Sequence, residues 1–62
     1  MKLSDVLAHA MCNQLVILET MDERELMRAM AVYGSEFELY LDYDVYGIGA
    51  DDKEILRVTL KD

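Results

Sequence analysis

Acidic side chains recur through the segment FELYLDYD, residues 37 to 44, and they are the strongest chemical signal in this sequence. If the segment is extended, Glu38, Asp42 and Asp44 share one face, because alternate side chains of a strand point the same way and lie about 6.6 Å apart. A row of carboxylates on a rigid backbone can imitate a nucleic-acid backbone and occupy a basic groove. The simpler interpretation is a solvated sheet face, which composition alone favours.

Catalytic and metal chemistry have little support. His9 and Cys12 stand three residues apart, a spacing that brings side chains together on a helix. An exposed histidine and a small buried thiol are the commoner meaning of such a pair, and two ligands are too few for a structural zinc site. A calcium loop starting at Asp42 fails, because Tyr46 holds its fifth position and Lys53 its twelfth. We therefore expect a protein that is not an enzyme, with no catalytic residue, metal or cofactor.

The totals indicate one small, acidic domain. The chain has 62 residues, 53% of them apolar, which is too many for a disordered chain and enough for a single core over residues 1–62. Thirteen acidic residues outnumber six basic ones, for a net charge of −7. This balance argues against direct nucleic-acid binding and favours a basic protein partner. In isolation we expect a monomer or a weak dimer.

Localisation follows from what the sequence lacks. No apolar stretch approaches the roughly 18 residues of a membrane span. Ser4, Asp5 and His9 interrupt any apolar region near the N-terminus, so we expect no signal peptide. A lone cysteine suits a reducing compartment. The expected location is the cytoplasm, that of the host cell if the chain is phage-encoded.

The first half of the chain predicts a helix, a strand and a second helix. Residues 4–12 carry apolar positions at helical spacing, with Ser4 as a plausible N-cap. Residues 14–19 contain an unbroken apolar run and predict a strand that needs cover on both faces. Thr20 and Glu23 fit a capping box for a helix to about Val32. Met21, Met27 and Met30 near this helix are core filler or an adaptable pocket.

The second half predicts two strands. The alternation in residues 37–44 indicates a half-buried antiparallel strand, with Phe37, Leu39 and Leu41 on its core face. The Gly-rich residues 47–52 predict a turn. Residues 53–61 predict a last strand with Leu56 and Val58 facing the core. The expected fold is α+β, a small antiparallel sheet with two helices in the order α-β-α-β-β.

The segment LSDVLAHAMCNQLVILET, residues 3–20, resembles the opening of the phage-encoded uracil-DNA glycosylase inhibitors. Residues 3–5 and 14–17 match that family identically at the same spacing, and residues 19–21 take the place of its Glu-Ser-Ile. The match is specific over the first 21 residues and loose afterwards. The chain departs from the family in a shorter junction after the strand, in Arg24 and Arg28, and in ending before a further strand hairpin.

The resemblance implies a protein mimic of DNA. In the family, the first strand lies in the DNA groove of the glycosylase, and the glutamate at its end takes the position of a phosphate. A pocket between the second helix and the sheet captures an apolar side chain that the enzyme wedges into DNA. Carried over by position, the partner-binding residues would be Glu19, Thr20, Met21, Glu23, Glu25, Leu26, Met30, Leu39, Leu41, Leu56 and Val58, with either Leu39 or Leu41 lining the pocket.

Two other functions stay open at this point. An acidic decoy against a restriction or CRISPR nuclease would use the same carboxylates without depending on Glu19. A small protein–protein interaction module or toxin–antitoxin component would carry an ordinary solvated acidic surface.

Overall fold

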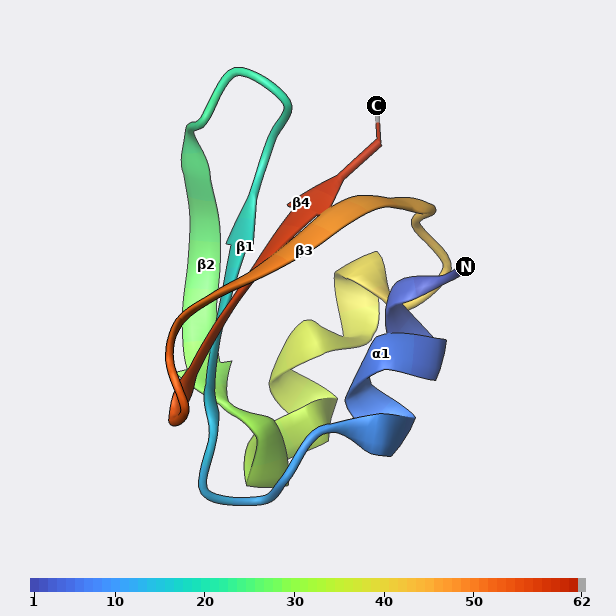
Figure 1. The fold of residues 1–62 in the computed structure, drawn as a ribbon. Helices are drawn as coiled ribbons and strands as arrows, with labels where there is room; N and C mark the ends of the chain where they lie inside the picture. Colours follow the sequence, from blue (N-terminus) through green and yellow to red (C-terminus); the bar gives the residue numbers. More distant parts are fainter. Residues whose placement is uncertain (62) are drawn as a thin grey trace.

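The protein is an α+β domain whose two helical segments lie on one side of a four-stranded sheet (Figure 1). The computed structural model describes residues 1–61. Its elements are α1 (Leu3–His9), β1 (Leu15–Glu19), β2 (Glu25–Met30), η1 (Ala31–Tyr40), β3 (Val45–Asp52) and β4 (Ile55–Leu60). The α+β class with two helical segments is therefore confirmed, and so are the first helix, the first strand and the last strand.

The sheet has the strand order β2-β1-β4-β3 and consists of two antiparallel hairpins joined by a parallel pair. The hairpins are β1–β2 and β3–β4, while β1 and β4 run parallel at the centre. The sheet is thus mixed, where the sequence predicted an antiparallel one. β1 carries apolar residues on both faces, which is the pattern of a strand with neighbours on both sides, whereas β4 alternates Leu56, Val58 and Leu60 with Arg57 and Thr59.

The core lies between the sheet and the helical segments. Val16 and Leu18 of β1 and Val58 of β4 are fully buried on this face. They pack with Leu3 of α1 and Phe37 of η1, which are also fully buried. Burying apolar side chains of this size contributes about 1.5–3 kcal/mol each, so this contact between layers holds a chain that has no disulfide.

The first helix begins earlier than predicted and is capped differently. The backbone N–H of Lys2, the N-cap residue, donates a hydrogen bond to the Asp5 carboxylate at 3.0 Å. Asp5 therefore caps the start of α1, and Ser4 lies inside the helix. α1 ends at His9, three residues before the predicted end. Its buried residues Leu3 and Val6 face the sheet, as helical spacing requires.

The predicted second helix over residues 20–32 is wrong, because residues 25–30 form strand β2. The Thr20 hydroxyl accepts hydrogen bonds from the N–H groups of Asp22 and Arg24, at 3.3 and 3.2 Å, and so organises a hairpin turn instead of a helix cap. Glu23 takes a left-handed φ of 65° in this turn. Residues 25–30 are mostly good helix formers, so pairing with β1 overrides their local propensity.

The predicted strand over residues 37–44 is also wrong, because η1, a 3₁₀-type segment kinked at Tyr33, runs to Tyr40. The buried side chain of this segment is Phe37, and Tyr40 and Leu41 pack beside it against the core. That spacing of three and four residues is helical. A strand would have buried Leu39 with Phe37, but Leu39 is 84% exposed.

The glycines of residues 47–52 mark a strand and not the predicted turn. Gly47 and Gly49 lie within β3 and pair with Thr59 and Arg57 of β4. Neither glycine has a positive φ. Their alternation leaves one face of β3 without side chains at positions 47 and 49, and the chain turns only at Lys53 and Glu54.

Two alanine substitutions distinguish the helical segment from a strand. Phe37→Ala should cost about 3–5 kcal/mol of unfolding free energy, because it empties a fully buried site. Leu39→Ala should change it by less than about 0.5 kcal/mol, because this side chain is exposed. Urea denaturation followed by circular dichroism measures both. Equal losses would contradict the helical placement of residues 37–40.

Candidate protein-binding surface

The three carboxylates predicted to form one acidic row lie on separate parts of the fold. Glu38 belongs to η1, Asp42 to the turn after it, and Asp44 to the approach to β3. All three are exposed. Asp44 forms an ion pair with Lys2, at 3.5 Å. The row on a strand is therefore a wrong prediction, because the segment that was to carry it is helical and then turns.

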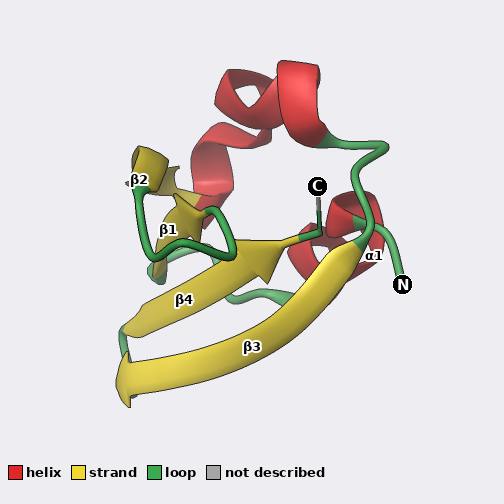
Figure 2. Ribbon diagram, turned by 90° about the horizontal axis from the view of Figure 1, so that it is seen from above, coloured by secondary structure: helices red, strands yellow, loops and turns green. Residues whose placement is uncertain are grey.

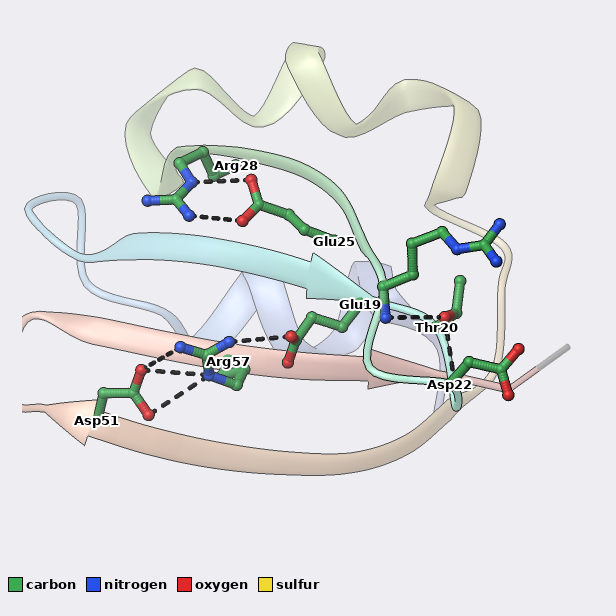
Figure 3. Close-up of polar contacts among 8 residues, drawn as sticks. Glu19, Thr20, Asp22, Glu25, Arg28, Asp51 and Arg57 are labelled. Atoms are coloured by element: carbon green, nitrogen blue, oxygen red, sulfur yellow. Dashed lines mark hydrogen bonds and ion pairs between the residues drawn. The ribbon is translucent and has the colours of Figure 1, made fainter.

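Glu19 ends β1 as predicted, but its carboxylate is already paired. The residue is only 8% exposed, and Arg57 Nη1 donates to Glu19 Oε2 at 2.9 Å. The same guanidinium also binds the Asp51 carboxylate of β3 (Figure 3). Glu19 thus sits in a three-residue network across β1, β4 and β3, and its charge is compensated within the protein.

This network lies on the sheet face that no helix covers, beside a second ion pair. Arg28 of β2 binds the Glu25 carboxylate with two hydrogen bonds (Figure 3). Ile17 lies between the two arginines, in register with Arg28 on one side and Arg57 on the other. It is only 4% exposed although no helix packs on it. The aliphatic stems of the arginines can provide this cover while their charged ends stay in water.

The ion pairs shift the pKa values of this face. Hydrogen bonds from Arg28 hold the pKa of Glu25 below its ordinary value, and those from Arg57 do the same for Asp51. Hydrogen bonds to Asp51 and then Glu19 raise the pKa of Arg57. Because Glu25, Asp51 and both arginines are in contact with solvent, the Glu25–Arg28 and Asp51–Arg57 pairs add little to stability.

The remaining residues predicted after Glu19 occupy the β1–β2 hairpin. Thr20, Met21 and Glu23 form its turn, and Met21 is 45% exposed. Leu26 and Met30 lie on β2, not on a helix, and Met30 stands opposite Leu15 on the open face. The pocket between a second helix and the sheet therefore does not form as expected.

A cavity of about 290 Å³ does exist, between α1 and the β3–β4 hairpin. Its lining is mainly apolar and consists of Met1, Asp5, Val6, His9, Ala10, Ile48 and Leu56. Of the predicted pocket residues, only Leu56 lines it. Val58 is fully buried in the core, Leu41 packs against the core and Leu39 points to solvent.

The sequence interpretation missed Ile48 because it lies in the glycine-rich segment that predicted a turn. The signal that could have found it is alternation, since Ile48 is flanked by Gly47 and Gly49 and followed by Ala50. In an extended chain, this places the isoleucine on one face and both glycines on the other. Cys12 and His9 are both exposed and form no pair, and His9 Nδ1 instead contacts the Asp5 carbonyl oxygen at 2.9 Å.

Within residues 1–61, no three His, Cys, Asp or Glu side chains cluster as a metal site would require. None of the helices in that range is long and apolar enough to cross a membrane.

Comparisons of the chain with protein-family models, with curated proteins and with solved structures gave no match.

Paired substitutions test whether the two ion pairs act separately. Arg57→Gln should raise the pKa of Asp51 toward 3.8, its ordinary value, and leave the pKa of Glu25 below its ordinary value. Arg28→Gln should raise the pKa of Glu25 and leave that of Asp51 low. A carboxylate whose folded pKa is depressed stabilises the fold above its unfolded pKa and loses that effect as pH falls through the folded value. The Asp51 contribution is therefore lost progressively as the pH falls below about 4.

Carboxyl carbon shifts in an NMR titration measure both pKa values. If Asp51 titrated normally in the unsubstituted protein, or if Arg28→Gln shifted it as much as Arg57→Gln, the assignment of the pairs would be wrong.

Proposed function

We propose that this chain is a non-enzymatic inhibitor of a host uracil-DNA glycosylase and acts by occupying the DNA groove of the enzyme. The observation that carries the proposal is the segment of residues 3–21. This segment resembles the glycosylase inhibitors in sequence, and it folds as a helix followed by a strand that ends at Glu19. The helix and the strand end are the two features that the family resemblance requires of this segment.

Charge and shape give further support. A net charge of −7 favours association with a groove built to bind phosphates and speeds the encounter. A glycosylase flips a base out of the stack, so a decoy gains from an apolar socket for the side chain that fills the gap. The cavity lined by Ile48 and Leu56 offers such a socket, beside α1 and not beside a second helix.

The Glu19–Arg57 pair sets a condition on this mechanism. To act in place of a phosphate, Glu19 has to exchange Arg57 for a donor of the enzyme. Arg57 keeps a carboxylate partner in that exchange, because Asp51 binds the same guanidinium. The exchange therefore replaces one charge-assisted hydrogen bond with another and leaves no arginine without a counterion.

Inhibition is the first expected outcome. Purified protein at an equimolar ratio to the glycosylase should abolish uracil release from uracil-containing DNA, because the decoy and the substrate occupy the same groove. Gel or fluorescence assay of base release measures this. Undiminished release at a several-fold excess of the protein would rule the proposal out.

The contribution of Glu19 is tested with a charge-matched control. Glu19→Gln keeps the shape of the side chain and a hydrogen bond to Arg57, yet removes the charge. It should weaken inhibition by about tenfold, roughly 1.4 kcal/mol, because a charged group at the centre of an interface is lost. Glu36→Gln removes one exposed charge from η1 and should change inhibition by less than about twofold.

Equal effects of the two substitutions would mean that overall charge alone matters, as expected for an acidic decoy against a restriction or CRISPR nuclease.

A small protein–protein interaction module is the second candidate. The observation in its favour is that Glu19 is compensated by Arg57 and that the acidic row is dispersed over separate elements. On this alternative the charges keep the surface soluble and the ion pairs hold the open face. It predicts no inhibition of the glycosylase at any ratio.

A further inference from the structure

The outer edge of β3 is the feature that carries an inference beyond the proposed inhibition. β3 is the last strand of the order β2-β1-β4-β3, and it lies at the rim of the sheet, away from η1 (Figure 2). An edge strand presents backbone groups that can pair with another chain. Which groups of β3 point outward follows from the hydrogen bonds of its neighbour β4.

The backbone groups of alternate residues in β4 form hydrogen bonds with different neighbouring strands, β1 on one side and β3 on the other. Leu15 N–H donates to Glu54 O at 2.7 Å, so in the parallel ladder the even residues from 54 to 60 bond to β1. The odd residues therefore face β3, and Lys61 N–H donating to Asp44 O at 2.8 Å agrees with this.

The register then fixes the two sides of β3. Gly47 and Gly49 pair with Thr59 and Arg57, odd residues of β4, and so bond inward. Ile48 and Ala50 pair with even residues of β4, so their N–H and C=O groups point out of the sheet. This part of the edge carries no charge and no proline, the residues that usually block an added strand.

The N-terminal residues already use the first position along this edge. Lys2 and Asp44 form an isolated antiparallel bridge, with Val45 N–H donating to Met1 O at 2.8 Å. The ammonium of Lys2 lies 3.5 Å from the Asp44 carboxylate. Extended backbone on the edge of β3 is therefore held here by both a ladder hydrogen bond and a cation paired with an acid.

Charge decides which occupant suits the rest of the edge. Asp52 has no cationic partner among residues 1–61, and exposed Glu54 follows it in the turn. A second copy of this chain, paired antiparallel about Ile48, would bring its Asp52 to the position opposite Asp44 that Lys2 already occupies, so the full antiparallel pairing is blocked at both ends. A segment with Lys or Arg meets these carboxylates favourably.

The apolar cavity adds a side-chain requirement. Ile48 is 49% exposed and lines the cavity together with Leu56 and Met1. A strand added to β3 alternates its side chains, so every second one points to the helix side and can reach this cavity. On the opposite side, Gly47 and Gly49 present no side chain, and space is open where a Cβ would stand.

We propose that the edge of β3 from Tyr46 to Ala50 binds an extended basic segment of a partner protein as a fifth strand. One apolar side chain of that segment enters the cavity at Ile48, and the Lys or Arg residues of the segment pair with Asp52 and Glu54. This is strand addition, in which backbone hydrogen bonds give affinity and side-chain pockets give selectivity. It does not depend on the identity of any inhibited enzyme.

The test selects ligands without assuming a partner. Random peptides of about twelve residues, displayed on phage, are selected against the full chain without an N-terminal tag, which could itself extend along the edge. Selected peptides should be rich in Lys or Arg and carry an apolar residue at alternate positions. A synthetic copy should bind with an affinity that falls at least about tenfold in Ala50→Pro, which removes one outward N–H, and less than about twofold in Ala50→Ser.

Circular dichroism checks that Ala50→Pro is folded. If it is not, Ile48→Lys replaces it, because a cation at this exposed position repels a basic strand and should lower affinity similarly. Selected peptides that bind both variants as well as the parent chain would overturn the proposal. So would a selection that yields no basic peptides, or a dimer of the chain that Ala50→Pro dissociates.

Discussion

The parallel pairing of β1 with β4 is the constraint on which the rest of this structure depends. It joins two antiparallel hairpins that would otherwise have no contact within the sheet. It places Val16 and Leu18 beside Val58 on the covered face, where helix and sheet form the core. On the other face it brings Arg57 next to Ile17 and within reach of Glu19. A two-stranded hairpin alone is marginal in water, so the central pair makes one domain of 62 residues out of two weak units.

The apolar residues on the two faces of the sheet are shielded from water in different ways. One face is buried by α1 and η1, which meet it with Leu3 and Phe37. No helix of residues 1–61 covers the other face, where Arg28 and Arg57, each paired with a carboxylate, flank the buried Ile17. On this face the charge of Glu19 is compensated by Arg57. The mechanism of inhibition proposed for the chain therefore involves an exchange of partners at Arg57, and the apolar cavity and the edge of β3 lie elsewhere, on the α1 side and the rim of the sheet.

The elements predicted correctly are those whose hydrophobic pattern is compatible with only one type of secondary structure. The run Leu15–Leu18, apolar on both faces, suits only a central strand, and alternation in residues 55–60 leads to the last strand. The prediction for residues 25–30 is wrong because these residues are strong helix formers, and their pairing with β1 is a tertiary contact that local propensity does not reflect. Residues 37–41 satisfy both periods, and only the exposure of Leu39 distinguishes them. Within the candidate site, the position of Glu19 at a strand end was predictable, whereas its pairing with Arg57 depends on a parallel register that no local pattern encodes.

Calorimetric titration of the purified chain into a host uracil-DNA glycosylase tests the central claim most directly. The account predicts binding at one molecule per enzyme, with an affinity that falls as salt is raised, because an acidic surface meets a basic groove. It also predicts that DNA bound beforehand in the groove of the enzyme prevents the reaction. Absence of binding, or binding that is indifferent to both salt and DNA, would contradict it.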